Sequence, residues 1–224
     1  MRRARGAARA GDRGARGGAR YPGTMRTPTA PVAATVAALV AALFALAACG
    51  GAPTDVTPEH REAAAHRAAA AAQRLGGALL TELTSALDTG PPEEAVHVCA
   101  DVAQRISVDI AAAEGVAVGR TALRVRNPAN APDDWERKVL SEWATGMGGD
   151  GPSSAVVDTP DGPALRWMSP IRLVGLCTQC HGDDTQISTA TRAAIADRYP
   201  DDQATDFAVG DIRGAFTVTV PLRP

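Results

Sequence analysis

Two cysteines separated by two residues and followed directly by a histidine constrain this chain more than any other feature. The run reads Cys177-Thr178-Gln179-Cys180-His181. In an exported chain, this pattern is the attachment signature of haem c: two thiols add across the porphyrin vinyl groups, and the adjoining histidine becomes an axial ligand of the iron. We therefore predict one covalent haem c, with thioether bonds from Cys177 and Cys180 and with His181 on the iron.

Two other sites use paired cysteines. A thioredoxin-like redox pair needs C-x-x-C to open a helix after a strand. Here the run 170–176 is a candidate strand before the motif, so this alternative stays open. A zinc site needs about four nitrogen or sulfur ligands, and the sequence lacks a second spaced pair to supply them.

The start of the chain indicates export. An uncharged apolar run, Val32 to Ala48, follows Arg26 and is short for a membrane span. It ends in small residues before Cys49, which resembles a bacterial lipobox whose cysteine is lipidated. We predict a leader and lipoprotein signal peptide over residues 1–48, with Met25 as a candidate start, and a lipidated tether over 49–57. An ordinary signal peptide or an uncleaved anchor is the alternative.

The leader is basic, whereas the rest of the chain is acidic. Eight of the 23 basic residues and one of the 25 acidic residues lie in the first 48 positions, so the remainder carries 15 positive and 24 negative charges, a net of −9. An acidic domain is a poor candidate for binding nucleic acid. We expect the folded part to be exported and lipid-anchored to a membrane, facing the periplasm or the cell exterior, because several acyl chains on one terminus give a stable anchor.

The remaining cysteine, Cys99, lies in a segment with helical periodicity. A lone thiol outside the cytoplasm is a liability unless it is buried or bound. At about 100° per residue, Cys99 shares one face with Ala95, Val102, Ala103, Ile106 and Ile110, and His97 lies about 160° away. If the sixth iron ligand comes from this helix, the periodicity favours Cys99 over His97. A small buried core residue is the alternative. The other candidates are expected on helix surfaces or in the core: His60, His66, Met147 and Met168.

Several runs, taken together in order and spacing, resemble the exported monohaem c domain first described from cyanobacteria. That domain occurs alone and as the input domain of membrane sensor kinases. The resemblance covers most of residues 58–222, and the R-N-P-x-N and C-x-x-C-H-G runs make it specific. The matching runs are Val98-Cys99, 118–121, 126–136, 176–182, 199–204 and 210–215.

The resemblance implies a PAS-like α+β fold with one covalent haem over residues 58–224. Residue by residue, Cys177 and Cys180 match the thioether pair, His181 the proximal ligand and Cys99 the distal cysteine ligand. The difference lies in architecture, because no transmembrane helix or kinase follows the domain before Pro224.

The pattern of elements also indicates an α+β domain, since helices precede a mostly antiparallel sheet. We predict helices over 58–88 (interrupted near Gly76-Gly77), around Cys99, over 132–147 and over 185–198. Strands are expected within 115–125, as a hairpin of 153–158 with 164–171, and over 211–221.

Three arginines, Arg120, Arg124 and Arg126, precede the 127–132 loop and are candidate contacts for the anionic haem propionates, because a guanidinium pairs with a carboxylate through two hydrogen bonds. Exposed strand charges are the alternative. The three tryptophans could pack on the porphyrin or form plain core: Trp135, Trp143 and Trp167.

With His181 and Cys99 both on the iron, no vacant coordination position remains, so we do not expect an enzyme. Thiolate donation stabilises ferric iron and predicts a reduction potential below that of a His/Met cytochrome c. Two roles remain: a redox or small-ligand sensor, in which Cys99 leaves the reduced iron and its helix shifts, or an electron carrier on the membrane surface, steered by its acidic surface to basic partners. The partner is accordingly expected to be a redox or signalling protein.

Overall fold

The computed structural model describes residues 56–222, apart from the side chain of Cys99. The predicted signal peptide, Cys49 and residues 49–55 of the tether lie outside the described residues and stay predictions. Within residues 56–222, no helix is both long and apolar enough to span a bilayer.

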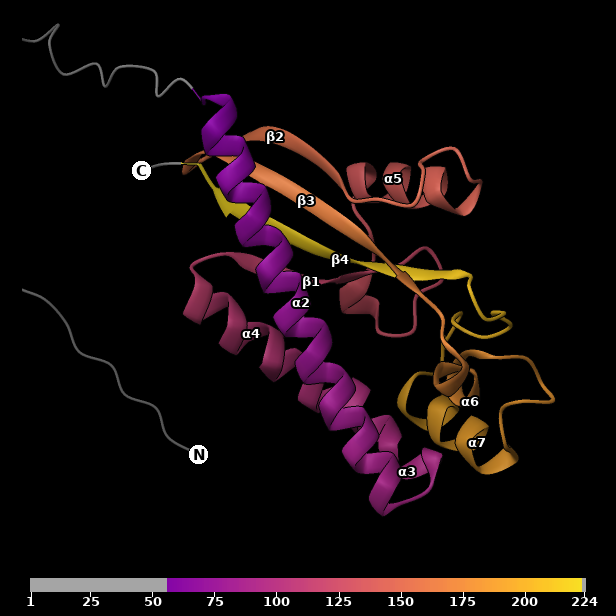
Figure 1. The fold of residues 1–224 in the computed structure, drawn as a ribbon. Coiled ribbons are helices and arrows are strands. Elements are labelled where there is room, and N and C mark those ends of the chain that lie inside the picture. The colour runs from indigo at the N-terminus through magenta and orange to yellow at the C-terminus, as the bar shows by residue number, and fades with distance from the viewer. Residues whose placement is uncertain (1–55, 223–224) are drawn as a thin grey trace, which may run out of the picture. The chain divides into compact units, whose positions relative to one another are not determined.

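Four strands form one antiparallel sheet in the order β1-β4-β3-β2 (Figure 1). The helices lie before and between these strands, which confirms the predicted PAS-like α+β fold with its N-terminal helical segment. The strands are β1 (Ala117–Thr121), β2 (Ser153–Thr159), β3 (Gly162–Arg172) and β4 (Ile212–Pro221). The α-helices are α2 (Pro58–Thr89), α3 (Pro92–His97), α4 (Ala103–Glu114), α5 (Asp134–Ala144), α6 (Thr178–His181) and α7 (Thr189–Arg198).

The sheet is covered on both faces, because successive side chains of a strand point to opposite sides. On β3, Leu165 and Trp167 pack against the alanine-rich face of α2, which lies across the sheet in Figure 1. Met168, the next residue, points the other way and packs with Leu140 and Trp143 of α5. Trp143 and Trp167 are therefore plain core residues.

The first long helix is not interrupted at Gly76-Gly77 as the sequence predicted: α2 is continuous from Pro58 to Thr89. Gly76 faces the sheet, where a Cβ atom would lie 2.9 Å from Cζ of Phe216 on β4. For Gly77, nothing lies within 4 Å of such a Cβ atom. The first glycine thus lets the helix approach Phe216 closely and does not end the helix.

These two glycines give a matched pair of substitutions. We expect Gly77→Ala to raise the free energy of unfolding by about 1 kcal/mol, because alanine has the higher helix propensity and meets no neighbour. Gly76→Ala gains the same propensity but crowds Phe216, and overpacking costs about 1–3 kcal/mol. Urea unfolding should therefore find Gly76→Ala the less stable variant by roughly that overpacking cost. Equal free energies of unfolding for the two variants would show that the Phe216 ring moves aside at no cost.

The helix that carries Cys99 also differs from the prediction of a uniform α-helix. Residues Val98–Val102 form a π-helical turn between α3 and α4, in which the N–H of Ala103 donates to the carbonyl oxygen of Val98, five residues earlier. Such turns are rare and frequent at functional sites. The wider turn breaks the constant 100° step, so burial is not confined to the predicted face: Val98 and Ala100 are buried, whereas Ile106 is only half-buried.

The last helix, α7, begins at Thr189 and not at the predicted residue 185. Ser188 caps it by accepting a hydrogen bond from the N–H of Thr191, which fixes the helix start. The preceding residues form a turn around Asp183, whose carboxylate accepts from the N–H and the hydroxyl of Thr185. This turn begins two residues after His181.

Candidate functional site

A cavity of about 220 Å³ lies at the end of the sheet where β1 and β3 finish and β4 begins. Two helices, the C-x-x-C-H run and the ends of these strands form its walls. The apolar lining comes from Leu83, Leu87, Ala95, Val96, Ala122, Val125, Ile171, Leu173, Leu176 and Tyr199. The polar and sulfur-bearing lining comes from Arg120, Thr121, Arg126, Asn127, Asn130, Arg172, Cys177, Gln179, Cys180, His181 and Arg213.

The predicted haem-attachment residues meet on one tight turn at this cavity. The N–H of Cys177 donates to the carbonyl of Val174 at 2.9 Å, closing a 3₁₀ turn, and α6 follows at once. No disulfide joins Cys177 to Cys180. The structure therefore brings Cys177, Cys180 and His181 together in the lining of a single cavity.

Gly182 lets the backbone turn sharply behind His181. A Cβ atom at this position would lie 2.6 Å from the carbonyl oxygen of Thr178 and 2.2 Å from Oε1 of Gln186. The turn places the carbonyls of His181 and Gly182 where the N–H groups of Phe207 and Asp206 donate to them, at 3.0 and 2.7 Å. The segment after α7 is thereby held against the motif.

The imidazole of His181 is oriented by a backbone carbonyl. Its Nδ1 lies 2.7 Å from the carbonyl oxygen of Ala204. Because a carbonyl only accepts, Nδ1 carries the proton and Nε2 keeps its lone pair. A protonated Nδ1 cannot also accept from Nε of Arg213, 3.2 Å away, so that approach is an electrostatic contact. A carbonyl that fixes the ring tautomer is the usual support of a metal-binding histidine.

The electrostatics of the cavity keep His181 neutral. Burial lowers the pKa of His181 well below its ordinary value, and the positive charges of Arg213, Arg126 and Arg120 lower it further. The hydrogen bond to Ala204 acts in the opposite direction and does not outweigh them. A neutral imidazole is the form that coordinates a metal ion, since the lone pair must be available.

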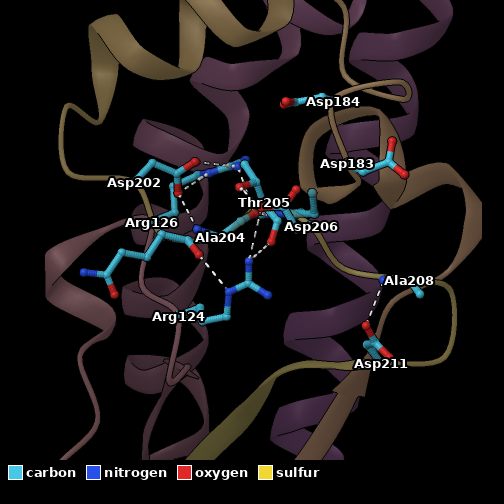
Figure 2. Close-up of polar contacts among 12 residues, drawn as sticks. Arg124, Arg126, Asp183, Asp184, Asp202, Ala204, Thr205, Asp206, Ala208 and Asp211 are labelled. Atoms are coloured by element: carbon cyan, nitrogen blue, oxygen red, sulfur yellow. Dashed lines mark hydrogen bonds and ion pairs between the residues drawn. The ribbon is translucent and has the colours of Figure 1, made fainter.

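A buried ion pair clamps the same turn (Figure 2). Arg126 and Asp202 make two parallel hydrogen bonds of 3.0 and 2.9 Å, and their side chains are 8% and 9% exposed. The same guanidinium donates to the carbonyl oxygens of Cys180 at 2.6 Å and Ala204 at 3.2 Å. Arg126 therefore holds both the backbone carbonyl of Cys180 and the carbonyl that orients His181.

The three arginines predicted as propionate contacts occupy different places. Arg120 and Arg126 line the cavity, whereas Arg124 lies outside its lining. Arg124 donates to the carbonyls of Gln203, at 3.0 Å, and Thr205, and its guanidinium carbon lies 4.2 Å above the Phe207 ring. Whether any of them binds a propionate stays a prediction.

Sequence reasoning missed four contributors to this site. Arg213 and Thr121 line the cavity, Ala204 orients His181, and Asp202 pairs with Arg126. Three of the runs that carry the family resemblance, 118–121, 199–204 and 210–215, contain these four residues. That resemblance was the only signal pointing to these residues, and it gave them no role.

The structure places the backbone of Cys99 in the π-helical turn and says nothing of its side chain. Ala95 and Val96, on the helix immediately before it, line the cavity, so this helix forms one of its walls. His97 is exposed. The other candidate ligands among the described residues also lie outside the lining: His60, His66 and Met147 are exposed, and Met168 is core.

The described residues fit a c-type haem. Two thiols and a neutral imidazole with its Nε2 lone pair are the donor set that such a haem requires. The helices contribute apolar side chains, and the described lining contains four arginines and no carboxylate, which suits a ligand that is apolar with anionic groups.

Comparison with known proteins is consistent with this site. A family model described as Tll0287-like matches residues 35–221. One solved structure, described as the cyanobacterial heme-protein Tll0287, is similar in fold, with a TM-score of 0.52 and 24% identity over 74% of this chain and 96% of that one. No curated protein matches the chain.

Proposed function

The chain belongs to the Tll0287-like family, and on this premise we propose that it is a c-type haem protein with one covalent haem at the Cys177–His181 turn. The similar cyanobacterial structure is described as a heme protein. The observation that carries the proposal is that Cys177, Cys180 and a carbonyl-oriented, neutral His181 line one cavity.

In this proposal Cys177 and Cys180 hold the porphyrin by thioether bonds, and His181 binds the iron through Nε2. Such a haem supplies a one-electron couple whose potential depends on the axial ligands. The chain's own part is to hold the imidazole in one tautomer through Ala204 and to keep the turn in place through Arg126.

We further propose Cys99 as the second axial ligand. The support is indirect: its helix forms a wall of the cavity, and it lies in a π-helical turn of the kind that functional sites often use. With both axial positions filled, no position is open to a substrate, so we propose no catalytic role. We also propose export and a lipid anchor at Cys49, which would hold the domain at a membrane surface.

The role that we propose is a redox or small-ligand sensor, acting on a partner signalling protein. Cys99 directly follows α3, separated from it only by Val98, so a change in its ligation would act on that helix. Val96 of α3 packs with Ile195 of α7 and with Tyr199, the residue after α7. Release of the thiolate would thus change the packing of two helices. A sensor needs an element with two packing states, and we propose that these helices provide it.

An electron carrier is the second candidate, and one observation favours it. The segment 177–211, which contains the motif, has seven aspartates and two arginines. Asp183, Asp184 and Asp211 of this segment are exposed and are labelled in Figure 2. An acidic surface around a redox centre steers basic partners, with a rate that falls as ionic strength rises.

The first experiment tests the haem. The full chain, produced in cells that attach haem c, should carry the mass of one haem that acid–acetone does not extract. Cys177→Ala with Cys180→Ala should carry none, and His66→Ala, at an exposed site, should be unaffected. Haem that is extracted from the unaltered chain would refute the covalent site.

The second experiment separates sensor from carrier. If Cys99 is released on reduction, carbon monoxide should bind the ferrous protein and not the ferric one. A ferrous protein that is inert to carbon monoxide, and that exchanges electrons rapidly with a basic partner at low salt but slowly at high salt, would favour the carrier.

A further inference from the structure

One polar side chain of the cavity wall has no hydrogen-bond partner among the residues that the structure describes. Thr121, the last residue of β1, is 3% exposed and lines the cavity. Its Oγ1 is the only buried side-chain oxygen or nitrogen among the described residues that makes no hydrogen bond. Leaving a buried hydroxyl unsatisfied costs free energy, so a hydrogen-bond partner beyond the described residues is favoured at this position.

The nearest neighbours of Thr121 across the sheet offer no polar side chain. In the sheet, Thr121 pairs with Ala215, and its neighbours Ala122 and Gly214 also lack a polar side chain. A Cβ atom on Gly214 would lie 2.5 Å from the carbonyl oxygen of Thr121, so the strands are too close for a larger residue there. The cavity is the remaining direction from which a partner can come.

The charge of the cavity indicates what that partner is. Arg120, next to Thr121 on β1, and Arg213 of β4 both line the cavity. The positive charge of each lowers the pKa of His181, which lies in the same lining. The described lining contains no carboxylate of the protein. An anionic group in the cavity is drawn to this wall, and a hydroxyl donates a short, strong hydrogen bond to an ionised carboxylate.

We infer that Thr121 donates a hydrogen bond to a carboxylate of the molecule that fills the cavity. This inference rests on the proposed function, in which that carboxylate is a haem propionate. The propionate is held at the wall formed by Thr121, Arg120 and Arg213. Thr121 is thus a positioning residue for the haem, and the wall differs from the set of arginines that the sequence alone suggested.

The test compares Thr121→Val, which keeps the shape and removes the hydroxyl, with Thr121→Ser, which keeps the hydroxyl. Both are made in the full haem-loaded chain. We expect the propionate bending band in the resonance Raman spectrum to shift to lower frequency in Thr121→Val and to stay in place in Thr121→Ser. We also expect Thr121→Val to lower the midpoint temperature of unfolding of the loaded protein.

Three outcomes would overturn the inference. A higher midpoint temperature in Thr121→Val would show that the hydroxyl stays unsatisfied in the loaded protein, because removing an unpaired buried group is stabilising. An unmoved propionate band would show that another group accepts the hydrogen bond. A changed ferric charge-transfer band with an unmoved propionate band would assign the hydroxyl to an axial ligand. If the unaltered chain binds no haem, the proposed function fails by itself, and the haem extraction experiment detects that separately.

Discussion

Arg126→Ala is expected to lower the free energy of unfolding by about 3–5 kcal/mol, because it leaves the carboxylate of Asp202 buried without its partner. It also removes the donor that holds the carbonyls of Cys180 and Ala204. Haem attachment should therefore fall together with stability. Urea unfolding, with the haem content of the same samples, measures both effects.

A second arginine–aspartate pair in the same chain is the control. Arg198 contacts Asp101, but their side chains are 53% and 58% exposed. Arg198→Ala should cost at most about 1 kcal/mol, since exposed ion pairs contribute little. Arg126→Lys keeps the charge but cannot make two parallel hydrogen bonds, so we expect an intermediate loss. Equal losses in the free energy of unfolding for Arg126→Ala and Arg198→Ala would contradict the stabilising role of the buried Arg126–Asp202 pair.

Cys99→Ala is expected to change the ferric absorption spectrum and to raise the reduction potential on the order of 0.1 V or more, since axial ligands tune haem potentials over about 0.8 V. The physical reason is that a thiolate donates electron density and stabilises ferric iron. Spectroelectrochemical titration of the loaded protein measures the change.

His97→Ala is the matched control for Cys99→Ala, because His97 is close by in the sequence and exposed. It should leave both the spectrum and the potential unchanged. If His97→Ala reproduces the effect and Cys99→Ala does not, the sixth ligand is the histidine. If neither variant changes the ferric spectrum, the ligand lies on another element.

Local patterns were sufficient to predict most of the fold. The hairpin around residues 160–162 and the strand over 211–221 follow from alternation, and both are confirmed as β2–β3 and β4. The continuity of α2 could not be predicted, because the reason for Gly76 is Phe216, 140 positions later in the chain. The π-helical turn was also missed, since a helical wheel assumes a constant step.

In the site, too, local features could be predicted and contacts between distant residues could not. Cys177, Cys180 and His181 are adjacent in sequence, and their spacing is dictated by the chemistry of attachment. Arg126 and Asp202 are 76 residues apart, and nothing in a single sequence indicates that they form a pair. The roles of Ala204 and Thr121 depend on a backbone carbonyl and on a missing hydrogen bond, neither of which a residue type reveals.

The pyridine haemochrome spectrum of the purified full chain tests the central claim most directly. Alkaline pyridine replaces the axial ligands, so the position of the reduced band reports only how the porphyrin is attached. With both Cys177 and Cys180 bonded, we predict the band of a haem c with two thioethers, moving toward that of a haem with one remaining vinyl group in Cys177→Ala. A spectrum with no haemochrome band, or with the band of an unattached haem, would contradict the account.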